Sequence, residues 1–160
     1  MTKRYYIAYG SNLNIEQMRS RCPSATVAGV SAIPDYQLLF KGSQTGAYLT
    51  IEPHKGGCVP VAVWEVPPVD ERSLDRYEGC PRFYYKTEME LPVFHVDGGS
   101  VMSISAFVYI MREDRLPGIP MQYYVDTCLA GYRAFGFDEG KLSDAIMLSL
   151  ERCREMRLRS

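Results

Sequence analysis

The sequence predicts an α+β fold, a mixed, barrel-like sheet of five to six strands with flanking helices. Three observations favour this class. Strand-like apolar runs occupy about the first two thirds of the chain, short helical pieces lie between them, and the last third has helical spacing. A chain of 160 residues can bury one sizeable core but not two ordinary ones, so residues 1–160 are expected to form a single domain.

Strands are expected where short apolar runs end at turn residues. These segments are 5–9, 36–40, 48–51, 59–66, 84–91 and 101–110, with a turn at 42–46 before the third and a turn at 97–99 that joins the last two. In the fourth segment Val59, Val61 and Val63 lie on one side, and Ala62 and Trp64 lie on the other. Because both sides are apolar, this strand is expected to be buried on both faces.

Capping residues indicate where helices begin and end. Asn14 is expected to cap a short helix that runs through Arg19, with Gln17 placed to complete a capping box. Asp70 is expected to cap a second short helix that stops at Gly79. Two longer helices are expected at 122–135 and 142–158.

Composition excludes several classes of protein. A hydrophobic fraction of 46% and a charged fraction of 23% are ordinary for a globular domain. The net charge of -1 provides no general attraction to nucleic acid or to a membrane surface, so neither partner is expected. The first residues lead into a short strand without a long apolar stretch, so no signal peptide or spanning helix is expected and the protein should be cytoplasmic.

The five cysteines are scattered, form no C-x-x-C pair and have only two histidines to accompany them. This spacing fits neither a disulfide framework nor a zinc site. The cysteines are therefore expected to be reduced and mostly to fill the core as small apolar residues. No metal site and no cofactor is predicted.

The segment Tyr9-Gly10-Ser11-Asn12 is the first candidate for a functional site. A strand ends there in a glycine turn and a helix begins almost at once, which leaves backbone N–H groups free and adds positive potential. A carboxylate or a developing oxyanion could dock on these groups. A Gly-Ser-Asn turn on its own is more often only a turn, so this interpretation needs support from other segments.

Glu78 is the candidate for a catalytic base. It closes a predicted short helix, where the negative end of the helix dipole disfavours a carboxylate and raises its pKa above the reference of ~4.3. Flanking Tyr77, Phe83 and Tyr84 would partly desolvate the carboxyl group and raise its pKa further. The alternative is an ordinary solvated glutamate at a helix end.

Two tyrosines form a third candidate. Tyr123 and Tyr124 follow a proline-rich loop at 116–120 and lie at the start of a predicted helix. A tyrosine in such a position can point its hydroxyl group into a cleft, although it is more often a core or rim aromatic.

Together and in this order, these segments resemble the γ-glutamylcyclotransferase family, including its AIG2-like relatives. The likeness covers nearly the whole chain up to about Phe137. The matching segments are Tyr6 to Leu13, Cys22 to Ala25, Tyr36 to Phe40, Ala47 to Ile51, Val59 to Val66, Leu74 to Gly79 with Tyr84, and Pro120 to Tyr124 with Gly131. The resemblance implies the γ-glutamylcyclotransferase-like fold.

The resemblance also implies roles for individual residues. Glu78 would be the proton acceptor. Contacts to a small γ-glutamyl substrate would come from Tyr6, Ile7, Ala8, Tyr9, Gly10, Ser11, Asn12 and Tyr124. The sequence departs from the family at Met121, where Ser is usual, which puts one hydroxyl contact in doubt. It also departs at Pro81-Arg82-Phe83, where a Gly-containing segment is common, so the rim beside Glu78 would suit a different leaving amine.

In the implied reaction, the α-amine of the substrate attacks its own γ-carbonyl group, closes a five-membered lactam and releases 5-oxoproline and a free amine. The attacking amine must lose a proton and the leaving nitrogen must gain one, and one carboxyl group of raised pKa can do both. Neither a metal nor an organic cofactor is needed. The sequence leaves open the leaving amine, the ligand of the Gly10-Ser11 turn (α-carboxylate or oxyanion) and whether the protein forms a homodimer.

Two other functions fit parts of the sequence. Cys80 could be the nucleophile of an amide hydrolase, with Glu78 or a histidine as its base, although neither His54 nor His95 has an orienting partner in view. The second alternative is a non-catalytic module that binds a small ligand on the same fold, because fold does not determine function. Formation of 5-oxoproline would separate the enzyme from both alternatives.

Overall fold

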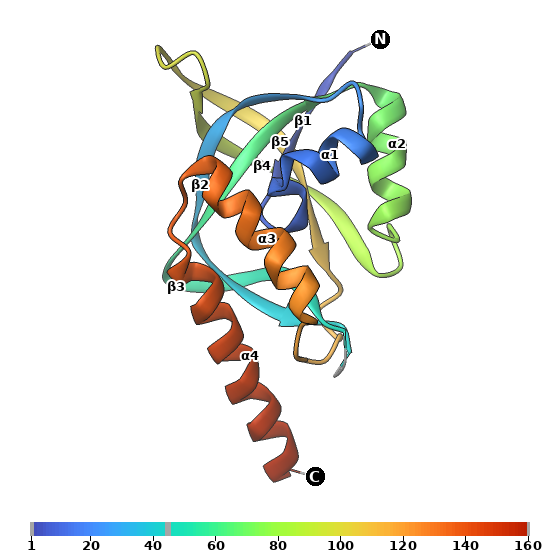
Figure 1. Cartoon of the computed structure of the whole chain (residues 1–160), viewed down its shortest axis with the longest axis vertical. Coiled ribbons are helices and arrows are strands. Elements are labelled where there is room, and N and C mark those ends of the chain that lie inside the picture. The colour runs from blue at the N-terminus through green and yellow to red at the C-terminus, as the bar shows by residue number, and fades with distance from the viewer. Residues whose placement is uncertain (1, 44–45, 160) are drawn as a thin grey trace.

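The structure is a computed structural model that describes residues 2–43 and 46–159, and its centre is a closed five-stranded barrel (Figure 1). The strands are β1 (Arg4–Ala8), β2 (Thr26–Lys41), β3 (Tyr48–Val66), β4 (Tyr84–His95) and β5 (Val101–Met111). Their order around the barrel is β1-β3-β2-β4-β5. β1 closes the barrel because it pairs antiparallel with β3 and parallel with β5. The predicted mixed, barrel-like sheet with flanking helices is therefore confirmed, with five strands.

Two strands are longer than the sequence predicts. The expected strands 48–51 and 59–66 are the two ends of β3, and the expected strand 36–40 is the last part of β2. Residues 52–58 look like loop because they are mostly polar and include Gly and Pro, yet they belong to β3, and Glu52, Pro53 and Cys58 pair with β2. An irregularity between Pro34 and Tyr36 bends the pair, and Gly56 N donates to Asp35 Oδ1 at 3.0 Å. In the predicted turn at 42–46, Gln44 and Thr45 lie outside the described residues.

The second half of β3 is the centre of the core. Val59, Val61, Val63 and Ala62 have no exposed surface, and Trp64 is 3% exposed. The prediction that this strand is buried on both faces is confirmed. The strand lies between β1 and β2, so its neighbours on both sides help to exclude water.

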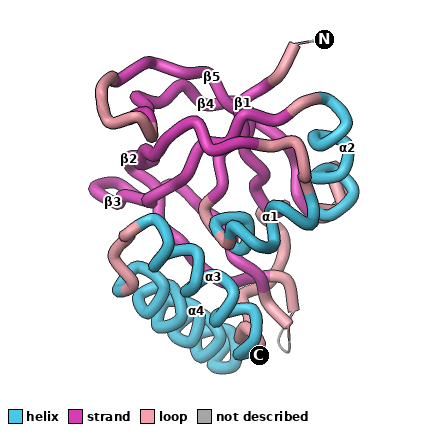
Figure 2. Tube along the Cα trace, turned by 45° about the horizontal axis from the view of Figure 1, so that its top comes forward, coloured by secondary structure: helices cyan, strands magenta, loops and turns pink. Residues whose placement is uncertain are grey.

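The two C-terminal helices are α3 (Gln122–Phe135) and α4 (Gly140–Arg159). The bounds of α3 are those predicted, and Gly136 ends it with a left-handed φ of 71°. α4 is fixed to the barrel at β2, where Phe40 N donates to Ser149 Oγ at 2.7 Å. In Figure 2, turned from the first view, α3 and α4 lie on the side of the molecule away from the N-terminus.

The short helices are η1 (Ser11–Leu13), α1 (Ile15–Arg21) and α2 (Pro68–Tyr77). Asn14 caps α1 as predicted, since its side chain accepts a hydrogen bond from Gln17 N at 3.0 Å. The predicted capping box is wrong, because the Gln17 side chain instead accepts a hydrogen bond from Arg21 at 2.5 Å. The predicted cap at Asp70 is also wrong.

Asp70 does not cap α2 because the helix begins before it. The helix starts at Pro68, whose fixed φ suits the first helical position, and Pro67 is the capping residue. The side chain of Asp70 is buried in the first turn and accepts a hydrogen bond from Ser24 N at 2.9 Å. This bond connects α2 to the segment that follows α1.

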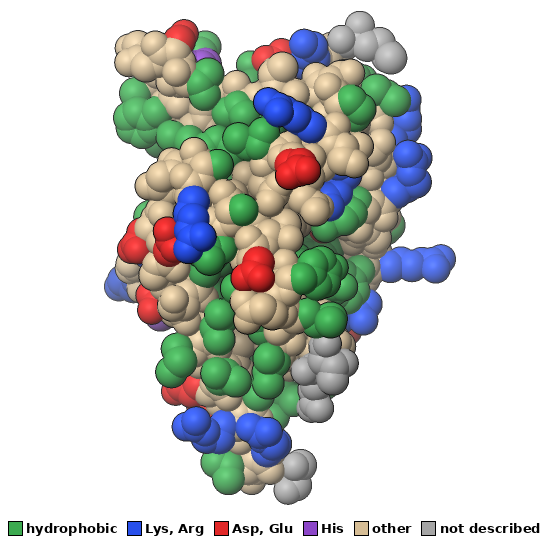
Figure 3. Space-filling model, in the orientation of Figure 1, with side chains coloured by type: hydrophobic (Ala, Val, Ile, Leu, Met, Phe, Trp, Pro, Cys, Tyr) green, Lys and Arg blue, Asp and Glu red, His purple; other side chains and the backbone are tan. Residues whose placement is uncertain are grey.

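The face seen in Figure 3 has Lys and Arg side chains interspersed with Asp and Glu side chains. Such interspersed charges create no extended field of one sign. Within residues 2–43 and 46–159, no helix is both long enough and apolar enough to cross a lipid bilayer.

Gly131 is predicted to be essential where α3 meets η1. A Cβ atom at this position would lie 2.5 Å from the carbonyl carbon of Leu13 and 2.7 Å from the backbone nitrogen of Asn14. Gly131→Ala should lower the free energy of unfolding by ~1–3 kcal/mol because the backbone cannot give way easily. Urea-induced unfolding measures this change.

Inside a helix, a Gly→Ala substitution usually changes the free energy of unfolding in the opposite direction. Replacing Gly by Ala inside a helix normally stabilises it by up to ~1 kcal/mol. Ala130→Gly, at the exposed position beside Gly131, is the matched control and should be destabilising by about that amount. A Gly131→Ala protein more stable than the wild type would contradict the close packing of α3 on η1.

Candidate active site

A cavity of about 520 Å³ lies where β1, η1, the end of α2, the start of β4 and the start of α3 meet. The chain has 12 tyrosines, and most of them line this cavity. They are Tyr6, Tyr9, Tyr48, Tyr77, Tyr84, Tyr109, Tyr123 and Tyr124. The wall thus combines apolar rings with hydroxyl groups, which suits a small polar ligand.

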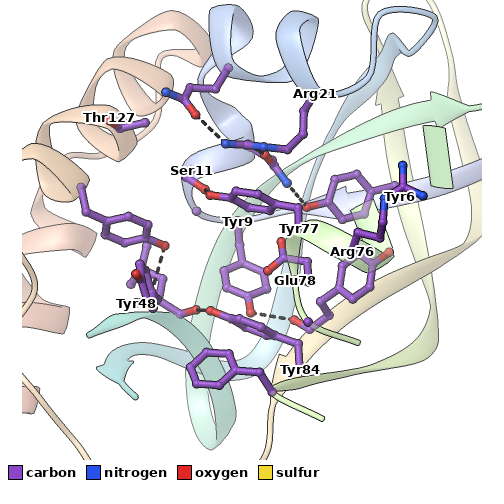
Figure 4. Close-up of a pocket in the computed structure, with 18 of the residues that line it drawn as sticks. Tyr6, Tyr9, Ser11, Arg21, Tyr48, Arg76, Tyr77, Glu78, Tyr84 and Thr127 are labelled. Atoms are coloured by element: carbon purple, nitrogen blue, oxygen red, sulfur yellow. Dashed lines mark hydrogen bonds between the residues drawn. The ribbon is translucent and has the colours of Figure 1, made fainter. Parts of the chain in front are cut away.

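Glu78 directly follows α2, and its carboxyl group points into this cavity among the tyrosine rings (Figure 4). Its backbone N–H still donates to Leu74 O at 2.9 Å, so the last turn of the helix fixes its position. Burial raises the pKa of the Glu78 carboxyl group to about 8, and the nearby charge of Arg21 partly opposes this shift. The pKa shift has the predicted direction, and burial is the cause that raises it.

The Glu78 carboxyl group has no hydrogen-bond or ion-pair partner in the part of the chain that the structure describes. Among the described residues, no hydrogen bond or ion pair reaches it, although the ring of tyrosines surrounds it. Other buried carboxyl groups normally find a donor, because an unpaired charge is costly in a protein interior. The carboxyl group of Glu78 is therefore free to exchange a proton with a molecule in the cavity.

The charge of Glu78 reaches most of the surrounding tyrosines. For each of them burial is the main cause of a raised pKa, and the negative charge of Glu78 raises that pKa further. These residues are Tyr6, Tyr9, Tyr77, Tyr84, Tyr109 and Tyr124. All six hydroxyl groups consequently stay protonated at neutral pH and can act as hydrogen-bond donors.

Several of these hydroxyl groups hold the cavity wall together. Tyr9 donates to the carbonyl oxygen of Tyr109 at 2.7 Å, and Tyr84 donates to the carbonyl oxygen of Leu49 at the same distance. The hydroxyl group of Tyr124 accepts a hydrogen bond from Leu49 N at 3.2 Å. These bonds cross between β1, β3, β4, β5 and α3, so they fix the wall from elements far apart in the sequence.

The glycine turn forms the wall across from α2. The N–H groups of Ser11 and Asn12 lie in the first turn of η1, and in the described chain no residue accepts a hydrogen bond from them. The Ser11 hydroxyl group lies 3.2 Å from the hydroxyl group of Tyr77. At Gly10 a Cβ atom would come within 3.4 Å of the Tyr124 hydroxyl oxygen, so the turn packs closely against the cavity.

The cavity brings together most residues of the sequence-based prediction. Those that line it are Tyr6, Ile7, Tyr9, Gly10, Ser11, Asn12, Glu78 and Tyr124. Ala8 is the exception, because it does not line the cavity. It pairs with Ala62 in the sheet, and its side chain is buried in the core.

Arg21 is a cavity residue that the sequence reasoning missed. From the last turn of α1 it donates through Nη1 to Asn12 Oδ1 and through Nη2 to Gln17 Oε1. Its guanidinium carbon lies 3.5 Å from the centre of the Tyr77 ring. Nothing local in the sequence marks this arginine, because its partners come from other elements. The tyrosine content alone could have indicated an aromatic site.

The structure weakens the thiol alternative. Cys80 does not line the cavity, and burial raises the pKa of its thiol, which disfavours the reactive thiolate. His54 is exposed on β3, and His95 has its Nε2 3.3 Å from Met102 Sδ on the β4–β5 pair. In the part of the chain that the structure describes, no three His, Cys, Asp or Glu side chains are arranged to hold a metal ion.

Comparison with known proteins assigns the chain to a family. Residues 6–126 match the family described as gamma-glutamyl cyclotransferase, AIG2-like. The match covers most of the chain, and the chain belongs to this family. The resemblance found in the sequence is thereby confirmed.

Individual relatives agree with this assignment. Gamma-glutamylcyclotransferase of Homo sapiens is 40% identical over 132 residues, 78% of this chain and 68% of the relative. Gamma-glutamylaminecyclotransferase of Rattus norvegicus is 33% identical over 79 residues, 48% of this chain and 53% of the relative, so the matched part spans about half of that protein. A solved structure of a gamma-glutamyl cyclotransferase superposes with a TM-score of 0.74 at 28% identity, over 90% of this chain and 88% of that one.

The raised pKa of Glu78 predicts how stability depends on pH. Because the folded pKa of about 8 lies above the ordinary glutamate value of 4.5, the folded protein binds a proton that the unfolded chain releases between these values. The contribution of this carboxyl group to stability is full below about pH 4.5 and is lost as the pH rises through about 8. Glu78→Gln cannot ionise. Its melting temperature minus that of the wild type should therefore be larger at about pH 9 than at about pH 5.

Thermal unfolding followed by circular dichroism at both pH values measures this difference. Glu155→Gln, at an exposed position on α4, is the control and should show no such dependence on pH. A difference between Glu78→Gln and wild type that is the same at both pH values would mean that the carboxyl group is solvated.

Proposed function

We propose that this protein is a γ-glutamylcyclotransferase that converts a small γ-glutamyl amine or γ-glutamyl amino acid into 5-oxoproline and a free amine. One observation carries the proposal: the carboxyl group of Glu78, which has no hydrogen-bond partner among the described residues and a pKa raised to about 8, shares a cavity with a turn of free N–H groups. Membership of the cyclotransferase family supports it. The proposed location is the cytoplasm.

The pKa of Glu78 suits the proton that must move. The reference pKa of an α-amino group is ~8, close to the value of about 8 for the Glu78 carboxyl group. Transfer of the proton from the substrate ammonium group to Glu78 would then cost little free energy, which is the condition for efficient general base catalysis. A carboxylate of ordinary pKa would be a much weaker base.

The proposed reaction needs no molecule other than the substrate. Glu78 accepts a proton from the α-ammonium group, and the free amine attacks the γ-carbonyl carbon, so a carbon–nitrogen bond forms and the carbonyl oxygen becomes negative. When the carbonyl forms again, the bond to the leaving nitrogen breaks and Glu78 returns its proton to that nitrogen. The ring nitrogen still carries one extra proton, which Glu78 also takes and passes to the released amine. The products are then 5-oxoproline, whose lactam is neutral, and a protonated amine, and Glu78 is ionised again. Holding both ends of the substrate close exploits proximity, which is worth ~7–11 kcal/mol in favourable intramolecular reactions.

The cavity fits a substrate of this kind. Its volume of about 520 Å³ is within the range of small-molecule sites. The free N–H groups of Ser11 and Asn12 would hold an anionic group of the glutamyl part. Met121 lies at the start of α3 and makes no side-chain capping bond, so the proposal uses no hydroxyl contact there.

A panel of γ-glutamyl amines and γ-glutamyl amino acids tests the proposal. The wild-type protein should form 5-oxoproline from at least one of them. Glu78→Gln should lower kcat by ~100-fold or more, because general acid–base groups contribute ~10²–10⁴-fold. Chromatographic assay of 5-oxoproline measures both results.

Glu155→Gln on α4 is the matched control and should keep wild-type activity. Retention of full activity by Glu78→Gln would exclude Glu78 as the base. If no panel member yields 5-oxoproline while a ligand still binds, the protein is a binding module instead.

The dependence of activity on pH follows from the same pKa. The base must be ionised, so kcat/KM should rise with pH, about tenfold per unit below pH 7, and level off near the Glu78 pKa of about 8. Initial rates of 5-oxoproline formation between about pH 5 and about pH 9 measure this limb. A rate that is already constant from about pH 5 would mean that the base has an ordinary carboxyl pKa.

A further inference from the structure

Three hydroxyl groups around Glu78 donate their protons to acceptors within the protein. Tyr9 donates to the carbonyl oxygen of Tyr109 at 2.7 Å, and Tyr84 donates to the carbonyl oxygen of Leu49 at 2.7 Å. The Tyr109 hydroxyl group donates to Asp75 Oδ1 at 2.6 Å. Because a phenol has a single proton, none of these three can also donate to a bound molecule.

Two further hydroxyl groups also have protein partners. The hydroxyl group of Tyr124 accepts a hydrogen bond from Leu49 N at 3.2 Å. The Tyr77 hydroxyl group lies 3.2 Å from Ser11 Oγ, and either can donate to the other. Tyr6 is the remaining tyrosine of the six near Glu78.

The bonds around Tyr6 fix the direction of its proton. Arg21 can only donate hydrogen bonds, so the atom of Asn12 that it contacts must be the amide oxygen. The amide nitrogen of Asn12 therefore faces Tyr6 and donates to its hydroxyl oxygen at 2.8 Å. The proton of Tyr6 must point elsewhere, and residues 2–43 and 46–159 contain no acceptor for it.

The hydroxyl group of Tyr6 lies where the reaction would occur. Tyr6 lines the cavity and is otherwise buried, with only 4% of its surface exposed. Figure 4 shows the Tyr6 ring and the Glu78 carboxyl group directed to the same part of the cavity. After burial, the charge of Glu78 is the largest contribution that raises the pKa of Tyr6, which agrees with a short separation.

We propose that Tyr6 is a catalytic hydrogen-bond donor to the γ-carbonyl oxygen of the substrate, and that Arg21 is a positioning residue that acts on Tyr6 through Asn12. This inference rests on the proposed function. As the substrate amine attacks, the carbonyl oxygen gains negative charge, and a donor already aimed at it binds this oxyanion more strongly than the neutral carbonyl. Tyr6 keeps its proton throughout, so proton transfer is left to Glu78.

The positive charge of Arg21 would strengthen this donor. A guanidinium group polarises the amide of Asn12, and the amide N–H in turn polarises the Tyr6 hydroxyl group. The contacts of Arg21 with Gln17 and with the ring of Tyr77 hold it in place. With the oxyanion held by Tyr6, the free N–H groups of the glycine turn are left for the α-carboxylate of the substrate.

Tyr6→Phe removes the hydroxyl group and little else. It should lower kcat by ~100-fold or more, the usual cost of losing one oxyanion donor. KM should change little, because the bond strengthens only in the transition state. The matched control is Tyr132→Phe, which deletes a fully buried hydroxyl group that has no hydrogen-bond partner within the described ranges and does not line the cavity. Its kcat should equal that of the wild type.

Two more measurements separate a catalytic role from a structural one. Replacing Tyr6 with mono- and difluorotyrosine keeps the shape and makes the phenol a stronger donor, so kcat should rise with phenol acidity. Arg21→Met should lower kcat several-fold in the wild-type background and have no further effect in the Tyr6→Phe background. These comparisons are made at saturating substrate and at a pH on the activity plateau of each variant.

The outcomes distinguish this inference from the proposed function. A wild-type protein that forms no 5-oxoproline from any panel member contradicts the proposed function. An active wild type with an equally active, folded Tyr6→Phe variant contradicts only the role of Tyr6. If Tyr6→Phe fails to fold, the fluorotyrosine series decides, and a kcat independent of phenol acidity overturns the inference. If Arg21→Met lowers kcat by the same factor in the Tyr6→Phe background as in the wild type, Arg21 does not act through Tyr6.

Discussion

The site depends on a carboxyl group that lies in the cavity and forms no hydrogen bond or ion pair with residues 2–43 or 46–159. An isolated charge in the interior of a protein is costly, so the neutral form of Glu78 is favoured and its pKa rises to about 8. The surrounding tyrosines present hydroxyl groups, yet most of these are already bonded to the backbone or to other side chains. The protein therefore keeps Glu78 unsatisfied, and a ligand in the cavity is the partner that could satisfy it.

Such a position is stable only if the helix that carries Glu78 is held firmly. Lys86 on β4 bonds to Glu71 at 2.6 Å and to Asp75 at 2.9 Å, and both carboxylates belong to α2. Tyr109 on β5 donates to the same Asp75. The buried side chain of Asp70 connects the first turn of α2 to the segment after α1. α2 is thus fixed along its length, which sets the direction of the carboxyl group at its end.

Barrel closure supplies the opposite wall. β1 pairs with β3 on one side and with β5 on the other, so the glycine turn that follows it has a fixed place at the end of the barrel. η1 then packs against α3 at Gly131, where a larger residue would overlap the backbone of Leu13. Together these contacts place the free N–H groups of the turn and Glu78 at one cavity, although the two are far apart in the sequence.

The sequence by itself determined the strand-rich first part, the bounds of α3, the end of α2 at Glu78 and the glycine turn, because each depends on local periodicity or local capping. It did not reveal that β3 is one strand, that Asp70 bonds to Ser24, or that Ala8 stays in the core. Only the tertiary structure decided the orientation of Asn12 between Arg21 and Tyr6, and the burial that raises the pKa of Glu78. The physical reason is that hydrogen-bond direction and desolvation are set by groups from distant segments, and no local pattern contains them.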